Sequence, residues 1–151
     1  MKTMRLSLIP VLTVLCASMF APVAAGATDL QPQTANGATW VCGGVGLDES
    51  SAMKQLSRNY PLMLTFTAGD GAYLADVQVK VSQKGHDPIV DVSCDGPMML
   101  LKLPAAGNYR VQASVNGHVQ ERNVSLKSGG HQRLMLRWPA AQAGLTPSAK
   151  Q

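Results

Sequence analysis

Few side chains in this chain have the types and spacing that catalysis requires. Ser51 and Lys54 stand three residues apart, as a serine nucleophile and a lysine base do in acyl-transfer enzymes, but no SDN or KTG sequence follows them. Asp91 and Asp95 flank a cysteine and form a candidate carboxylate pair of the kind that glycosidases use. We expect no enzyme, and a small hydrolase built on either pair is the alternative.

Three histidines are candidate metal ligands. His86, His118 and His131 each stand beside a glycine in a stretch typical of a turn. Metal sites usually show ligands a few residues apart, and no cysteine or second histidine lies that close to any of the three. We expect no metal site and no cofactor. A copper- or zinc-handling protein is a second alternative, because methionines are numerous for so small a domain: Met53, Met63, Met98, Met99 and Met135.

Residues 1–27 have the pattern of a secretory signal peptide. Two basic residues precede an apolar run over 6–20, and the small residues 25–27 offer a cleavage site. The run is shorter than the ~20 residues that span a bilayer, so we expect no stable membrane span after cleavage. Cys16 lies inside the run behind Leu15, which argues against lipidation. The predicted location is the periplasm or the medium.

Two cysteines remain outside the apolar run, Cys42 and Cys94. In an oxidising compartment such a pair in a small domain usually forms a disulfide, and the CxxC spacing of redox and metal sites is absent from the sequence. We predict a disulfide between Cys42 and Cys94. The sequence leaves open whether it forms within one chain or between two.

A single domain is expected after the signal peptide. The polar residues 28–39 predict a flexible leader, residues 40–138 a folded domain, and the Ala/Pro/Gln-rich residues 139–151 a disordered tail. Without residues 1–27 the chain keeps eleven basic and nine acidic side chains, a net charge of +2, with no run of Lys or Arg. A nucleic-acid interface needs a clustered positive stripe, so we expect no nucleic acid as a partner.

Alternating apolar residues between closely spaced turns predict an all-β fold. One short helix is expected over 48–58, with Asp48 as its N-cap and Leu47 packed on Ala52. The architecture that these patterns favour is a seven-stranded antiparallel Greek-key sandwich with that one N-terminal helix. The seven strand candidates are 62–67, 75–81, 90–94, 98–103, 109–115, 118–126 and 134–138.

Several turns and one irregularity are visible in the pattern. Gly69-Asp70-Gly71 and Asn116-Gly117 predict hairpin turns, and 83–88 predicts a loop. Val119 is out of phase with the rest of its strand, which predicts a bulge near Arg122.

Two apolar features need a covering element or a partner. Residues 98–103 are apolar on both faces, so we expect the helix or another chain to cover one of them. Met63 and Met135 fall on predicted outward positions and would form an exposed apolar surface that a partner could cover.

Four short motifs punctuate the strands: Asp95-Gly96, the corner Leu103-Pro104-Ala105-Ala106-Gly107-Asn108-Tyr109, Asn116-Gly117 and Ser128-Gly129-Gly130. Together they resemble the carboxypeptidase regulatory-like family of transthyretin-like sandwiches, over about residues 62–138. The resemblance implies a seven-stranded structural or interaction module, usually without catalysis. The corner carries one extra residue, and segment 40–58 is an addition to the family pattern. Residues 41–74 are similar to small secreted proteobacterial proteins, a likeness that implies a compartment and no activity.

The function that we expect from these observations is a non-catalytic secreted or periplasmic binding or accessory module. Its expected partner is an envelope protein, or a cell-wall or polysaccharide ligand, and the oligomeric state is open. The expected interaction loops lie around Gly69, Asp70 and Gly71, around His86 and Asp87, and around Asn116 and His118.

Overall fold

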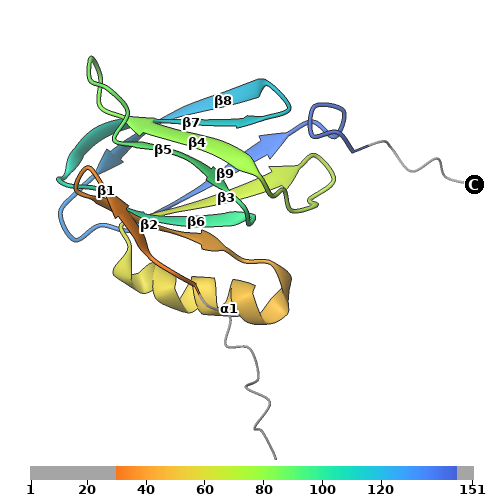
Figure 1. Ribbon diagram of the computed structural model, residues 1–151, viewed down its shortest axis with the longest axis horizontal. Coiled ribbons are helices and arrows are strands. Elements are labelled where there is room, and N and C mark those ends of the chain that lie inside the picture. Colours follow the sequence, from red (N-terminus) through yellow and green to blue (C-terminus); the bar gives the residue numbers. More distant parts are fainter. Residues whose placement is uncertain (1–29, 146–151) are drawn as a thin grey trace, which may run out of the picture.

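The computed structural model describes residues 30–145 of the 151-residue chain. In this range the chain is mostly β, with two sheets and one short α-helix (Figure 1). Its elements are β1 (Gln33–Ala35), β2 (Ala38–Gly43), α1 (Gly46–Leu56), the 3₁₀ turn η1 (Ser57–Asn59), β3 (Leu62–Ala68), β4 (Val77–Ser82), β5 (Val90–Cys94), β6 (Met98–Lys102), β7 (Gly107–Val115), β8 (His118–Leu126) and β9 (Gln132–Trp138).

The strands form a five-stranded sheet in the order β1-β2-β6-β3-β9 and a four-stranded sheet in the order β5-β4-β7-β8. All pairs are antiparallel except β3 and β9, which run parallel from Leu62 beside Gln132 to Ala68 beside Trp138. The expectation of a purely antiparallel sandwich is therefore wrong at this pair. Parallel neighbours need a long crossover, and here the whole four-stranded sheet lies between β3 and β9 in sequence.

The core lies between the two sheets, because alternate residues of facing strands are buried there. Val77, Val79 and Val81 of β4 are fully buried, as the alternation predicts, and they share one apolar cluster with residues of the five-stranded sheet. In that cluster the rings of Phe66 and Trp138 lie 6.4 Å apart.

All seven predicted strands are present, and β1 and β2 bring the number to nine in the described range. The predicted flexible leader over 28–39 is wrong from Gln33 onward, because β1 pairs with β2 and Ala38 is fully buried. β2 in turn pairs with β6, placing Trp40 beside Leu101. β2 is ordered by a partner strand about sixty residues away in the sequence. The polar composition of residues 28–39 does not reveal this distant partner.

The helix begins two residues earlier than predicted. Its N-cap is Val45 rather than Asp48, and the Glu49 carboxylate reaches back to accept a 2.9 Å hydrogen bond from the Val45 N–H. This bond satisfies one of the amides that helices leave unpaired at their start. Leu47 does not pack on Ala52, since 81% of its surface is exposed.

α1 covers the outer face of the five-stranded sheet and so forms a third layer (Figure 1). A second apolar cluster under it contains Val41, Met53, Met63, Met98 and Leu100. The expectation that the helix covers one face of the 98–103 stretch is thereby confirmed. Met63 is only 7% exposed in this cluster, so its predicted outward role is wrong, whereas Met135 is 56% exposed.

Both open sides of the sandwich are closed by bonds between the sheets. On one side the predicted disulfide joins Cys42 of β2 to Cys94 of β5, within one chain, with a Cα–Cα distance of 5.4 Å. On the other side β8 and β9 exchange three bonds from side chains to carbonyl oxygens: Gln120 Nε2 to Arg137 O (2.8 Å), Trp138 Nε1 to His118 O (2.9 Å), and Gln132 Nε2 to Ser125 O.

One predicted turn is confirmed and one predicted bulge is wrong. At 69–71 the chain reverses in a short hairpin, in which Ala68 N–H donates to Ala72 O at 2.7 Å and Thr67 bridges Tyr73, but β4 then joins the other sheet instead of pairing with β3. The β7–β8 register is continuous through Val111 beside Arg122, so there is no bulge. Val119 lies on the outer face of β8 and is 62% exposed. Its position out of phase with Val124 and Leu126 therefore needs no inserted residue in the strand.

The segment after β9 is folded back rather than disordered as far as it is described. Leu145 N–H donates to Ala140 O at 3.1 Å, and Asn116 Nδ2 donates to Gln142 O at 3.3 Å. The predicted tail is therefore wrong over 139–145, and its remainder lies outside the described residues, as does the predicted signal peptide with Cys16. Over residues 30–145 no helix is long and apolar enough to cross a membrane.

Candidate binding surfaces

The structure keeps the candidate catalytic pairs apart from each other. Ser51 and Lys54 lie on α1, outside the five-stranded sheet. Asp91 lies on β5 of the other sheet, where its carboxylate accepts a 2.7 Å bond from Gln78 Nε2 and lies 3.5 Å from Lys80 Nζ. Asp95 is exposed in the turn that follows. Asp91 is thus engaged by β4 side chains rather than paired with Asp95.

The three histidines lie on separate connections. His86 is in the β4–β5 loop, His118 begins β8, and His131 precedes β9 with its Nδ1 3.1 Å from Tyr60 O. Among the residues that the structure describes, no group of three or more His, Cys, Asp or Glu side chains is arranged to hold a metal ion.

Two of the three predicted interaction loops share one end of the sandwich. Gly69 lies close to Pro139 and Ala140, and Asn116 contacts Gln142 of the same folded-back segment. The loop over 83–88 belongs to the opposite end, since β4 enters it at Ser82 beside Arg110, near the start of β7. The predicted surface is therefore divided between two ends.

The outer face of the four-stranded sheet carries a row of polar side chains that are joined across the strands. One row across its strands reads Asp91, Lys80, Gln112 and Glu121, each beside the next in the pairing register. Gln112 Nε2 donates to Glu121 at 2.9 Å, and Arg110 Nε lies 3.2 Å from the same carboxylate. Such cross-strand bonds hold the side chains in fixed positions on the face.

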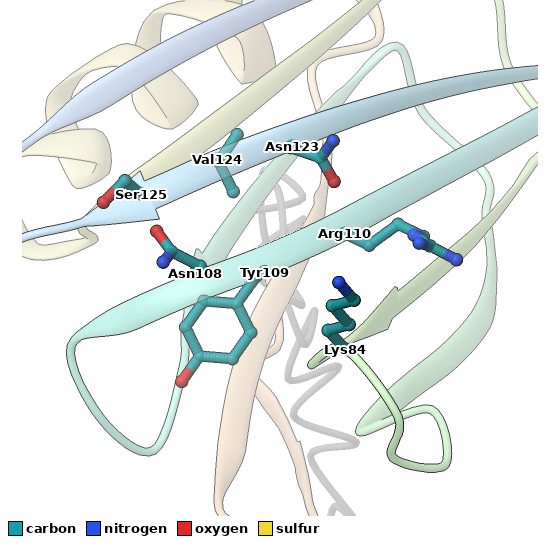
Figure 2. Close-up of a pocket in the computed structure, with 7 residues that line it drawn as sticks. All are labelled: Lys84, Asn108, Tyr109, Arg110, Asn123, Val124 and Ser125. Carbon is teal, nitrogen blue, oxygen red and sulfur yellow. The ribbon is translucent and has the colours of Figure 1, made fainter.

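A pocket of about 360 Å³ opens at one end of this face (Figure 2). Four polar side chains come from register pairs of β7 and β8, Asn108 beside Ser125 and Arg110 beside Asn123. They face outward because they alternate with buried Tyr109 and Val124. Figure 2 shows Lys84, from the β4–β5 loop, on the same side of the pocket as Arg110.

We call this hollow the polar pocket, after the five polar side chains among its seven lining residues, which can pair with a hydroxylated or anionic ligand. Two side-chain amides and one hydroxyl can each donate and accept hydrogen bonds, and Lys84 and Arg110 add positive charge. No carboxylate lines the pocket, although Arg110 is held from outside by Glu121. Lys84 takes part in neither of the two ion pairs among the described residues. The alternation of β7 and β8 could have identified the outward side chains of the pocket. Lys84 lies beside them only because β4, which precedes its loop, pairs with β7.

A second hollow lies on the opposite layer, between α1 and β9, and we call it the α1–β9 groove. It consists of two adjoining parts of about 390 and 270 Å³ that share Met63 and Arg133. Its apolar lining includes Met98, Leu134 and Met135. The other lining residues are Lys54, Ser57, Arg58, Tyr60, Thr65, Tyr73, His131 and Gln132.

Comparison with known proteins finds little. No model of a known protein family matches the chain, and there is no significant match among curated proteins. Among solved structures, a DUF3823 family protein from Parabacteroides merdae is similar with 20% identity and a TM-score of 0.38. The match covers 52% of this chain and 43% of that one, so the chain spans less than half of this neighbour's length. We base neither fold nor function on this likeness.

Proposed function

We propose that the chain is an exported, non-catalytic binding module of the cell envelope, and that its polar pocket takes an acidic polysaccharide. The observation that carries the proposal is the pocket lined by Lys84, Asn108, Arg110, Asn123 and Ser125. Sugar hydroxyls both donate and accept hydrogen bonds, as side-chain amides do. A carboxylate on the sugar would pair with Lys84, a cation outside both ion pairs of the described residues.

The face beside the pocket favours a chain of sugars over a small molecule. The ordered row through Lys80 and Gln112 carries the polar surface beyond the pocket onto β4 and β5. Neighbouring strands lie ~4.8 Å apart, so the side chains along this row present regularly spaced hydrogen-bonding groups to a repeating ligand. Binding rather than catalysis is supported by Asp91, whose carboxylate is engaged by Gln78 and Lys80 rather than paired with Asp95.

We also infer kinship with the carboxypeptidase regulatory-like sandwiches, on the basis of the corner before β7. Leu103 and Tyr109 are buried at either end of it, and the Tyr109 hydroxyl donates a 2.6 Å bond to Ala105 O. Gly107 has φ +151, at the edge of the region that side chains avoid. The seven-stranded Greek-key arrangement of that family is part of this inference.

Fractionation tests the location. We expect cells that express the full chain to release it with the periplasmic contents, shortened at its N-terminus and with the Cys42–Cys94 pair oxidised. Recovery of the full-length protein from the cytoplasm with free thiols would contradict the proposal.

Polysaccharide binding is tested on the protein recovered from that fraction, with a polyuronate as the probe and neutral dextran as the control ligand. We expect binding to the polyuronate that weakens with salt, and a loss of roughly tenfold or more in Lys84→Ala, the cost of one charge-assisted hydrogen bond. Lys102→Ala, which removes an exposed lysine of the other sheet, should bind as the wild type does. Equal affinity of both variants, or no binding to the polyuronate, would reject the pocket.

A further inference from the structure

The α1–β9 groove combines an apolar floor with a positive rim. Met135 and Tyr73 in its lining are 56% and 59% exposed, so part of the apolar lining is open to solvent. Lys54, Arg58 and Arg133 supply three positive charges, and no Asp or Glu is among the lining residues. The two ion pairs among the described residues involve none of these three cations. A complementary surface would be apolar and carry negative charge.

The start of α1 has that complementary character. Val45 and Leu47 are 61% and 81% exposed, and Asp48 and Glu49 follow them directly. We call residues 45–48 the α1 knob. Glu49 is engaged in the bond to Val45 N–H, whereas Asp48 is exposed and lies in neither described ion pair. The knob therefore presents two apolar side chains beside a free carboxylate.

The knob and the groove lie on the same side of the molecule, next to one another. Gly44, which precedes the knob, packs on the Met98 side chain so closely that a Cβ at this position would lie 2.9 Å from Met98 Cγ. Met98 also lines the groove. The knob does not fill the groove of its own chain, because Leu47 remains exposed.

We propose that two copies of this chain associate about a two-fold axis, each placing its α1 knob in the α1–β9 groove of the other. Adjacent patches on one face allow both contacts to form at once, since in a two-fold dimer each residue pair occurs twice. Leu47 would lie on the methionine floor, and Asp48 would face Arg133 and Lys54. The contact is small, so the dimer should be weak and dependent on concentration and salt. The polar pockets, on the opposite layer of each copy, would stay open.

Sedimentation of the full chain, purified from the expressing cells and measured over a concentration series, tests this proposal. The wild type should shift reversibly from monomer to dimer. Asp48→Lys and Arg133→Glu should each weaken dimerisation by roughly tenfold or more, because each places like charges in contact. The variant with both changes should dimerise close to the wild-type level, since the charge pair is restored in reverse. Leu47→Ser tests the apolar part of the contact and should weaken dimerisation as well.

Lys84→Glu is the matched control, because it reverses an exposed lysine on the opposite layer, and it should dimerise normally. Circular dichroism of each variant shows whether it has folded, and none of the substituted side chains is buried. A wild type that stays monomeric at every concentration would overturn the proposal. The proposal would also be overturned if the single charge reversals left dimerisation unchanged, or if the double variant did not regain dimerisation. Growth into open-ended oligomers would contradict the two-fold arrangement.

Discussion

The hydroxyl of Tyr109 donates a 2.6 Å hydrogen bond to the carbonyl oxygen of Ala105, four residues earlier in the chain. This bond closes the corner through which the chain passes from β6 in one sheet to β7 in the other. The Tyr109 ring is at the same time part of the core between the sheets and only 2% exposed. One side chain thus fixes both the course of a connection and the packing beneath it.

Removing this hydroxyl should destabilise the domain without disturbing the core. We expect Tyr109→Phe to lower the free energy of unfolding by about 1 kcal/mol, the typical net contribution of one hydrogen bond to stability. Urea denaturation measures the change. Tyr73→Phe is the control, because Tyr73 is 59% exposed, and it should unfold at the wild-type urea concentration. Equal stability of both variants would contradict the structural role of the bond.

The contact between Gly96 and Gly43 leaves no room for a side chain. A Cβ on Gly96 would overlap the carbonyl group of Gly43, which is backbone and cannot rotate away. We expect Gly96→Ala to cost about 1–3 kcal/mol, as other overpacked sites do. Gly69→Ala is the matched control, because the atom nearest to its Cβ would be the backbone nitrogen of Ala140 at 3.5 Å. Thermal unfolding compares the stability of the two variants. A Gly96→Ala variant as stable as Gly69→Ala would show that the backbone at Gly43 moves away from position 96 at little cost.

The disulfide should contribute a large share of the stability. Cys42 and Cys94 are 52 residues apart, and closing a loop of that length stabilises a domain by about 4 kcal/mol in the chain-entropy model. We expect reductant to shift the denaturation midpoint strongly downward. The Cys42→Ala/Cys94→Ala double variant should start from the lower midpoint and show no response to reductant. Alkylation of this cysteine pair in the unreduced native protein would contradict the bond.

The alternation of β4 predicts opposite outcomes at neighbouring positions. Val79 is fully buried between Val92 and Ala113, so Val79→Asp should leave the chain unfolded at room temperature. Lys80→Gln should change stability by less than about 1 kcal/mol, because the Lys80–Asp91 pair is exposed. Circular dichroism distinguishes the two outcomes. A folded Val79→Asp variant would mean that this face of β4 is not in the core.

Local patterns were sufficient for the seven strands from β3 to β9 and insufficient for their partners. The period-two burial of Val77, Val79 and Val81 can be predicted from the residue types alone, because successive side chains on a strand point to opposite faces. The parallel pairing of β3 with β9 cannot be predicted in this way, since it depends on how the intervening strands are arranged in space. For the same reason β2 could not be recognised before its partner β6 was known.

The polar pocket was missed for a related reason. Asn108 and Arg110 are predictable as outward residues of an alternating strand, and so is the turn that contains Lys84. That Lys84 joins them depends on β4 pairing with β7 rather than β8. The α1–β9 groove likewise depends on where the helix lies on the sheet, which its short apolar stripe does not specify.

The parallel pairing of β3 and β9 also has a consequence for biosynthesis. β3 receives its second neighbour from β9, so Leu62 and Ala68 of β3 have no partner on that side until Gln132 and Trp138 are present. A nascent chain on the ribosome therefore cannot complete the five-stranded sheet before residues 132–138 have been made. Until then the apolar side chains of its strands stay accessible to chaperones.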